Sequence, residues 1–144
     1  VMSFEVNGWR ILLHPLVLER IQEWQARATK GDVRSHKLLA GLNQLMFEVI
    51  PSDPGHPRFY VGHSLGSAFA HWRRAKMYQR YRVFFRFSSA HRSIVLVWIN
   101  DERSLRAYGA ATDAYATFQR MIERGTPPDD LDQLLWESEH DREK

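Results

Sequence analysis

The first half of the chain contains two stretches in which hydrophobic residues recur every three or four positions, the spacing of an amphipathic helix. One helix is expected to begin at His14-Pro15, because proline fits the first helical turn, and to end at Lys30-Gly31. A second helix follows and should end at Pro51. The residues on the two apolar faces are Val17, Ile21, Trp24, Ala28, Leu38, Leu39, Leu42, Leu45, Met46 and Val49. Two such helices make an antiparallel hairpin that needs a sheet to cover its apolar side.

Four further stretches have the alternating or continuous hydrophobicity of β-strands. The first covers residues 4–13, with Asn7-Gly8 as a bend or bulge. The other three, at residues 69–77, 80–87 and 94–99, follow one another as a meander. The last of them is apolar on both faces, which indicates an interior strand with the N-terminal strand beside it. Together with the helices, these strands predict an α+β domain.

The C-terminal third of the chain is predicted to be helical again. Thr112 is expected to cap a helix that closes at Gly125, and Pro127-Pro128 separates it from a last short helix. Residues 128–144 carry seven acidic side chains against two basic ones, a net charge of −5, so the rest of the chain has a net charge of +8. We interpret this acidic tail as a solvated helix end, with shielding of the basic face or contact with a partner as alternatives. The basic body indicates a polyanionic partner.

Length and composition limit the classes of protein to consider. The 144 residues suffice for one domain, and 44% hydrophobic with 26% charged residues is an ordinary globular composition. No apolar run reaches about 18 residues, and no signal-peptide pattern opens the chain. Cysteine is absent, which excludes disulfides and thiolate metal sites. We therefore expect a single domain over residues 1–144, located in the cytoplasm and without membrane contact.

Basic residues are concentrated on the meander and just after it. Arg74 and Lys76 share one strand face with Trp72, whereas Arg73 lies on the other. Arg82 of the next strand is expected to converge with the first pair. Guanidinium groups stay charged at any working pH and donate two parallel hydrogen bonds to phosphate oxygens. The cluster therefore favours polyanion binding over a merely solvated sheet face, but it does not establish catalysis.

Two other patterns, the GHSLG stretch and the histidines, are weaker indications of a catalytic or metal site. Residues 62–66 (GHSLG) match the nucleophile elbow of α/β-hydrolases, which needs a buried parallel strand before it and a helix after it. Here a proline and a short apolar run precede the motif and a basic strand follows, so we interpret it as loop. The seven histidines show no paired ligand spacing, and we expect no metal site.

A long part of the sequence resembles a known family. The segment YRVFFRFSSAHRSIVLVWINDERSLRAYGAATDAYATFQRMIERGTPP, with VNGWRILLHP near the start and HSLGS before the meander, is similar to the YhaV family, toxins of bacterial toxin–antitoxin modules in the RelE/ParE superfamily. The resemblance implies a RelE-like fold, with two N-terminal helices packed on a curved, mostly antiparallel four-stranded sheet and helices at the C-terminus. It also implies a ribosome-associated endoribonuclease that cleaves mRNA and inhibits translation. The implied partner is a PrlF-like antitoxin of the AbrB type, and operator DNA would be contacted only through the antitoxin complex.

The resemblance also implies site residues, position by position. The superfamily's basic pair falls on Arg74 and Lys76, and its later arginine falls on Arg103 or Arg106. The full catalytic set expected in this way is Arg74, Lys76, Arg82, Arg106 and Tyr108. The residues expected to contact RNA are Trp72, Arg73, Arg80, Arg86 and Arg103.

These residues suggest a mechanism without a metal or cofactor. The ribose 2′-hydroxyl would attack the adjacent phosphorus, leaving a 2′,3′-cyclic phosphate and a 5′-hydroxyl, while arginines neutralise the extra charge. Lys76 and Tyr108 are the candidates for proton transfer. Two other classes of function stay open, a ParE-like inhibitor of gyrase and a non-catalytic nucleic-acid-binding subunit that acts with its antitoxin.

Overall fold

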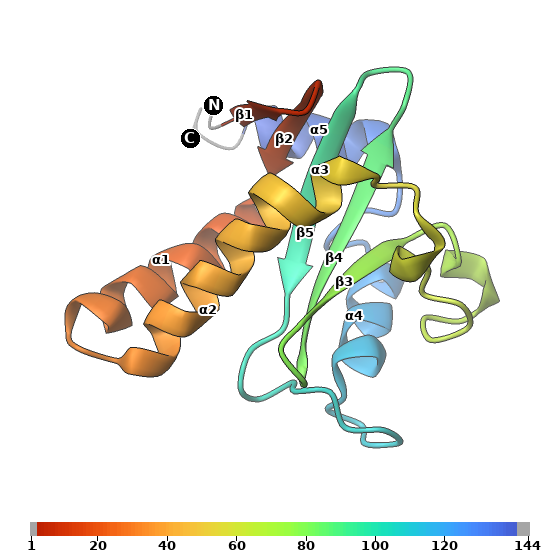
Figure 1. The fold of residues 1–144 in the computed structure, drawn as a ribbon. Coiled ribbons are helices and arrows are strands. Elements are labelled where there is room, and N and C mark those ends of the chain that lie inside the picture. The colour runs from red at the N-terminus through yellow and green to blue at the C-terminus, as the bar shows by residue number, and fades with distance from the viewer. Residues whose placement is uncertain (1–2, 141–144) are drawn as a thin grey trace.

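In the computed structural model, which describes residues 3–140, helices cover both faces of one mixed sheet (Figure 1). The strands are β1 (Ser3–Val6), β2 (Trp9–Leu13), β3 (Arg73–Met77), β4 (Tyr81–Ser88) and β5 (Ser93–Ile99). The α-helices are α1 (Pro15–Thr29), α2 (Val33–Gln44), α3 (Ile50–Ser52), α4 (Ala114–Glu123) and α5 (Leu131–His140). A π-helical turn at Leu45–Val49 joins α2 to α3, and 3-10 turns cover Pro57–Phe59 and Ser67–Phe69. The α+β class expected from the sequence is confirmed.

The sheet has five strands in the order β1-β2-β5-β4-β3, one more than expected. Residues 4–13 do not form one strand. They lie in a hairpin in which Val6 pairs with Trp9 and Asn7-Gly8 is the two-residue turn. Both turn residues have positive φ, 53° and 79°, a conformation that Asn-Gly adopts easily. β2 runs parallel to β5, whereas the other neighbouring pairs are antiparallel, so the interior position predicted for the strand at 94–99 is confirmed.

Each face of the sheet has its own hydrophobic core. α1 and α2 cover one face, and α4 and α5 cover the other (Figure 1). In the second core, Phe118 of α4 stacks on Phe84 and Trp98, with ring centroids 4.3 and 5.4 Å away, and meets Trp72 edge-on at 5.0 Å. Aromatic rings in these arrangements attract one another beyond the gain from burial. The four rings therefore fix α4 against β4 and β5.

The acidic C-terminal segment packs against the sheet. Leu134 of α5 is fully buried in the second core. Glu139 pairs with Arg10 of β2 at 3.1 Å, and Asp129, just before α5, accepts a hydrogen bond from the indole of Trp72 at 2.7 Å. The interpretation of this segment as a solvated helix end is therefore wrong, because its leucines and acids have specific partners on the sheet. Residues 141–144 of the expected tail lie outside the described residues.

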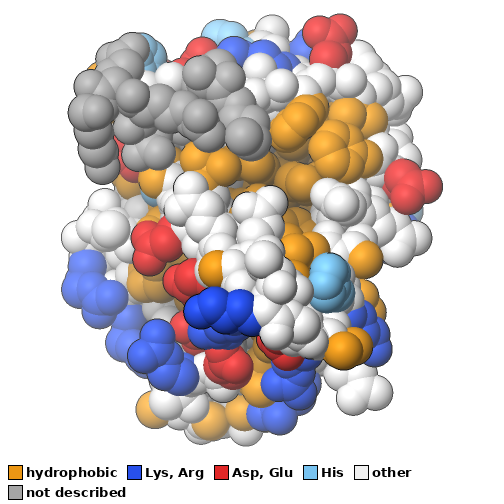
Figure 2. Space-filling model, turned by 90° about the vertical axis from the view of Figure 1, so that its left-hand side faces the viewer, with side chains coloured by type: hydrophobic (Ala, Val, Ile, Leu, Met, Phe, Trp, Pro, Cys, Tyr) orange, Lys and Arg blue, Asp and Glu red, His pale blue; other side chains and the backbone are white. Residues whose placement is uncertain are grey.

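The side of the molecule formed by the α1–α2 hairpin carries charges of both signs (Figure 2). In the lower half of that view, basic side chains are interleaved with acidic ones, and in the upper half hydrophobic side chains gather. Opposite charges at such short range compensate one another, so this side attracts a polyanion less than an unmixed cationic surface does. Within residues 3–140, no helix has the length and hydrophobicity needed to cross a membrane.

Candidate active site

Three arginines from separate segments meet at Tyr115, the second residue of α4. Arg74 of β3 and Arg82 of β4 each donate a hydrogen bond from Nε to its hydroxyl oxygen, at 2.9 and 3.1 Å. The guanidinium of Arg106, from the segment after β5, lies 4.7 Å from the centroid of the Tyr115 ring, within cation–π range. We call Arg74, Arg82 and Arg106 the arginine cluster. Its members are 32 residues apart along the chain from first to last, so only the fold brings their charges together.

Each guanidinium of the arginine cluster is partly committed to the protein. Nη1 of Arg74 donates to the carbonyl of Arg58 at 2.7 Å, and Nη1 of Arg82 donates to the carbonyls of Gln79 and Tyr81. Among the described residues, Nη2 has no protein partner in any of the three arginines; Arg74 and Arg106 are partly exposed, whereas only 7% of the surface of Arg82 is exposed. The existing bonds fix the orientation of each group, and the remaining N–H donors can bind an anion such as phosphate.

Asp113 both binds Arg106 and caps the N-terminus of α4. Its Oδ1 accepts hydrogen bonds from Nη1 of Arg106 at 2.6 Å and from the amide of Ala107 at 2.7 Å, and its Oδ2 accepts from the amide of Tyr115 at 2.9 Å. Asp113 therefore caps the helix, and the expectation that Thr112 does so is wrong. Burial of Asp113 acts to raise its pKa, but the hydrogen bonds from Arg106 and Ala107 outweigh burial, so the pKa lies below its ordinary value.

A buried amide connects the segment after β5 to the start of β4. Asn100 is fully buried, and its Oδ1 accepts a hydrogen bond from the amide of Arg82 at 2.7 Å. Its Nδ2 donates to the carbonyls of Arg80 and Ser104, at 3.0 and 2.8 Å. All the hydrogen-bonding capacity of the Nδ2 group is thus used, which fixes the backbone on both sides of Arg82.

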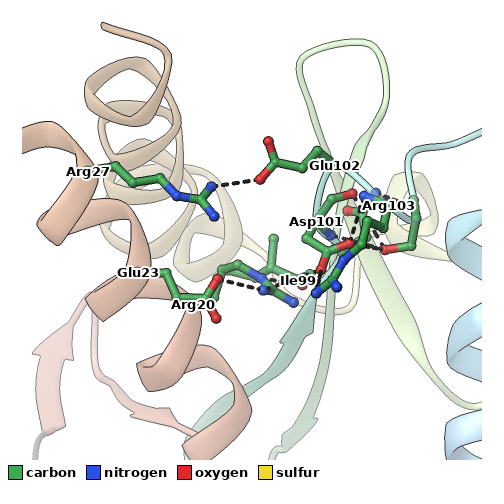
Figure 3. Close-up of polar contacts among 9 residues, drawn as sticks. Arg20, Glu23, Arg27, Ile99, Asp101, Glu102 and Arg103 are labelled. Carbon is green, nitrogen blue, oxygen red and sulfur yellow. Dashed lines mark hydrogen bonds and ion pairs between the residues drawn. The ribbon is translucent and has the colours of Figure 1, made fainter. Parts of the chain in front are cut away.

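Two arginines of α1 hold the same segment from the other side (Figure 3). Arg20 donates to the carbonyl of Ile99 at 3.1 Å and lies 3.7 Å from the carboxylate of Asp101, and Arg27 pairs with Glu102 at 2.7 Å. Burial acts to raise the pKa of Asp101, but hydrogen bonds and the charge of Arg20 together lower it. The chain that leaves β5 is therefore directed toward the arginine cluster by contacts on both flanks.

An open cavity of about 580 Å³ lies beside the arginine cluster. Its lining includes His63, Ser64, Arg106, Tyr108, Tyr115 and Gln119. Tyr108 is 93% exposed, and the guanidinium of Arg106 lies 4.9 Å from the centroid of its ring. A cavity of this volume is in the range that holds a small ligand. Phosphate and base of one nucleotide could therefore be bound side by side, on the cationic cluster and in the cavity.

The structure places the expected catalytic residues unequally. The arginine cluster and Tyr108 lie close together, because Arg106 contacts the rings of both Tyr108 and Tyr115. The resemblance allowed either Arg103 or Arg106 at this position, and the structure has Arg106 there. Lys76 pairs with Arg82 across β3 and β4, but its side chain is exposed and it lines a different cavity of about 210 Å³ with Arg58. The catalytic roles themselves stay predictions.

Three of the residues expected to contact RNA have structural partners. Trp72 is fully buried in the second core, so the prediction that it contacts a base is wrong. Arg73 lies over the ring of Tyr60, 4.6 Å from its centroid, and its Nη1 donates to three carbonyl groups just before β3. Arg86 donates to the backbone oxygen of Asp129 at 2.6 Å and covers Trp72. These two arginines hold the chain in place through Nη1, and Nε of Arg73 is buried without a hydrogen-bond partner.

Two other expected contact residues stay at the surface. The side chain of Arg80 donates from Nε to the carbonyl of Arg106 at 3.1 Å. Arg103 pairs with Asp101 at 3.5 Å, and its side chain is 90% exposed. Neither arrangement prevents contact with RNA, so both residues keep that role as a prediction.

Sequence reasoning missed Tyr115, Asp113 and His63. Tyr115 has the helical spacing of a core residue with Phe118 and Ile122, and it is indeed buried, although its hydroxyl and its ring both contact the arginine cluster. An acidic residue directly before an apolar helix is a recognised cap signal, which could have identified Asp113. His63 is one of the seven histidines without ligand spacing and part of the GHSLG stretch, and nothing in the sequence indicated that it would lie at the cavity.

The structure also describes the hydrolase-like GHSLG stretch and the side chains that could hold a metal ion. Residues 62–66 lie in a loop between two 3-10 turns, with no strand ending at the motif and no α-helix following it, so the interpretation as loop is confirmed. Among residues 3–140, no three His, Asp or Glu side chains are grouped so as to hold a metal ion.

Asp113→Asn should lower stability in a pH-dependent way. We expect a loss of about 1–2 kcal/mol at pH 7, because the charged hydrogen bonds to Arg106 and the helix N-terminus weaken. The folded pKa of Asp113 is below the unfolded value, so its contribution is fully present above the unfolded pKa and disappears as pH falls through the folded pKa. Urea unfolding from pH 7 to pH 3 measures the difference. Asp132→Asn, at an exposed position of α5, controls for net charge; a difference that persists unchanged at low pH would contradict this account.

Comparison with known proteins gives consistent results. The model of the YhaV toxin family matches residues 12–139. The family is described as a toxin with endonuclease activity, of a toxin–antitoxin system. Similar proteins include the toxin YhaV of Escherichia coli O6:H1 strain CFT073 and the ribonuclease toxin YhaV of Escherichia coli strain K12. Each is 41% identical over 145 aligned positions, which cover 93% of this chain and 94% of the relative. No solved structure matches the chain.

Proposed function

This chain belongs to the YhaV family, toxins with endonuclease activity from toxin–antitoxin systems, and we propose that its arginine cluster and the cavity beside it are where RNA is bound and cleaved. The observation that carries the proposal is the convergence of three guanidiniums on Tyr115. Their fixed positive charge, next to an open cavity, is the environment that a phosphodiester under attack requires.

The arginine cluster would act on the transition state. When the 2′-oxygen of ribose attacks phosphorus, the nonbridging oxygens gain negative charge, and the protein must neutralise it. The unpartnered Nη2 groups are donors that need no reorganisation, because the other nitrogens of Arg74 and Arg82 are already bonded to the protein. Donors fixed in this way commonly contribute about 10²–10³-fold each to the rate. The nucleophile belongs to the substrate, so the protein needs no nucleophile of its own.

Tyr108 is the better placed of the two predicted proton-transfer groups. It lines the cavity and contacts Arg106, whereas Lys76 lines another cavity. A phenol can give a proton to the 5′-oxygen as its bond to phosphorus breaks. The products would be a 2′,3′-cyclic phosphate and a 5′-hydroxyl, and the reaction as written uses no metal ion or cofactor.

A toxin of such a system has an antitoxin partner. We propose that this partner is PrlF-like and of the AbrB type, and that operator DNA is reached only through their complex. We also propose a RelE-like fold, mRNA presented by the ribosome as the substrate, and the cytoplasm as the place of action. The family resemblance supports these assignments. The wholly cationic composition of the arginine cluster, which suits a polyanion, supports RNA as the ligand.

The chemistry of the RNA ends tests the proposed function. Purified protein is added to a reconstituted translation reaction programmed with one mRNA, and the new ends are identified by their reactivity toward kinase and phosphatase. We expect 5′-hydroxyl and 2′,3′-cyclic phosphate ends, with full activity in protein that has been treated with EDTA and desalted. New 5′-phosphate ends, or activity lost by EDTA treatment and restored by a metal, would contradict the mechanism. Intact RNA together with inhibited gyrase would support the ParE-like alternative.

A further inference from the structure

The GHSLG loop is held rigidly at the edge of the cavity. Val61 and Leu65 are buried in the second core, with 3% and 0% of their surface exposed. Gly62 and Gly66 have φ of +59° and +85°, values that favour glycine over other residues. Two backbone hydrogen bonds close the loop, from the amide of Ser64 to the carbonyl of Val61 at 3.1 Å and from the amide of Gly66 to the carbonyl of His63 at 3.0 Å. The two exposed residues between these anchors, His63 and Ser64, therefore have a defined position, and both line the cavity.

The cavity needs a group that can accept a proton. The proposed function already assigns Tyr108 the role of proton donor, and a guanidinium such as that of Arg106 has hydrogen-bond donors but no acceptor. Asp113 is charged, but Arg106 and three backbone amides occupy its oxygens and lower its pKa, which weakens it as a base. The hydroxyl of Tyr115 is bonded to two arginines. His63 is the one remaining titratable side chain in the described lining of the cavity, and histidine is the residue type that exchanges a proton between pH 5 and 8.

We propose that His63 is the catalytic base that takes the proton of the attacking 2′-hydroxyl. The inference rests on the proposed function and adds the residue that the arginine cluster does not supply. An unprotonated ring nitrogen of His63 accepts the 2′-proton while the 2′-oxygen forms its bond to phosphorus. The bond from phosphorus to the 5′-oxygen then breaks, and that oxygen takes a proton from Tyr108. Water afterwards removes the proton from the His63 imidazolium and returns one to Tyr108, so the protein is unchanged after each turnover.

The first experiment compares His63→Gln with the wild type as a function of pH. Cleavage is followed in single-turnover conditions from pH 5.5 to 9, and RNA affinity is measured separately. We expect the variant to bind RNA as the wild type does but to cleave about 10²–10⁴-fold more slowly. The wild-type rate should rise with pH along an acid limb that the variant lacks. The other charged or titratable groups facing His63 are Arg106, Tyr108, Asp113 and Tyr115, and all of them remain in the variant. His91→Gln, in the exposed turn between β4 and β5, is the matched control and should keep full activity.

A second experiment separates the base from the acid. In RNA with sulfur in place of the leaving 5′-oxygen, the leaving thiolate needs no proton. This substrate should restore the rate of Tyr108→Phe to near that of the wild type, and it should leave the deficit of His63→Gln in place. A merely structural role of His63 would not produce this selective pattern.

Each outcome bears on one of the two proposals. If the wild type produces cyclic phosphate ends and His63→Gln stays within about threefold of it at every pH, the arginine cluster stands and His63 is not the base. Restoration of His63→Gln by the sulfur substrate would make His63 the acid and overturn the assignment. If the wild type cleaves nothing, or leaves 5′-phosphate ends, the proposed function fails first and this inference fails with it.

Discussion

Replacing Arg74 with alanine is expected to slow RNA cleavage strongly while leaving the fold intact. Arg74 lies on the edge strand β3, is partly exposed, and binds Tyr115 and one carbonyl group. Its loss removes a charge aimed at the phosphate and also releases the hydroxyl of Tyr115, so we expect the rate to fall by about 10²–10³-fold. The measurement is the single-turnover cleavage rate of one mRNA in a reconstituted translation reaction, alongside a circular dichroism melt.

Arg73→Ala is the matched control for this experiment. It removes the same charge from the neighbouring residue, whose side chain lies on the opposite strand face over Tyr60. We expect less than about a threefold change in rate, because a charge that does not face the phosphate contributes little. Arg74→Lys should fall between the two, since lysine keeps the charge but cannot present two parallel donors. Equal losses for Arg73→Ala and Arg74→Ala would show that total charge matters and that the arginine cluster does not.

The largest effect on stability is expected from Phe118→Ala. Phe118 is fully buried and contacts three other aromatic rings, those of Trp72, Phe84 and Trp98. Removal of a buried phenylalanine ring costs about 3–5 kcal/mol through lost burial and the cavity left behind. This is a large fraction of the roughly 5–15 kcal/mol that stabilises a typical domain. Urea unfolding should therefore show a much lower midpoint with an unchanged slope.

The activity of Phe118 variants would test how α4 positions the site. Phe118→Leu keeps most of the volume and should cost clearly less stability than alanine. Because α4 carries Tyr115 one turn before Phe118, we expect cleavage by Phe118→Ala to fall even at temperatures where the protein is still folded. Cleavage at the wild-type rate by a folded Phe118→Ala protein would show that α4 does not need this packing to position Tyr115.

Hydrophobic periodicity predicted most of the fold because the apolar faces of these elements are buried in one of the two hydrophobic cores. One exception is the strand expected at residues 69–77, which begins only at Arg73 because Ser67–Phe69 form a 3-10 turn. Another is the N-terminal hairpin, where β1 and β2 are four and five residues long and so merge into one apparent run. The Asn7-Gly8 pair was interpreted as a bend or bulge within one strand, whereas the structure has a two-residue turn there. The choice between them depends on the partner strand β5, which no local pattern reveals.

The site was predictable only where strand alternation determines direction. Alternation places Arg74 on the face shared with Trp72, and β4 supplies Arg82 to the same face. It cannot tell that Trp72 is covered by α4, nor that Arg86 lies beneath the segment before α5. Tyr115 was missed for a related reason. Its ring occupies a core position, as the helical pattern predicts, while its hydroxyl accepts a hydrogen bond from Arg82.

The order of these segments along the chain has a consequence during synthesis. The strand partner of β2 is β5, more than 80 positions later, and the group that gathers the arginine cluster comes later still, at residues 113–115. A growing polypeptide thus presents Arg74 and Arg82 long before it has the tyrosine that orients them and the aspartate that holds Arg106. A nascent chain therefore cannot assemble the arginine cluster until residues 113–115 have been synthesised and α4 has docked on the sheet.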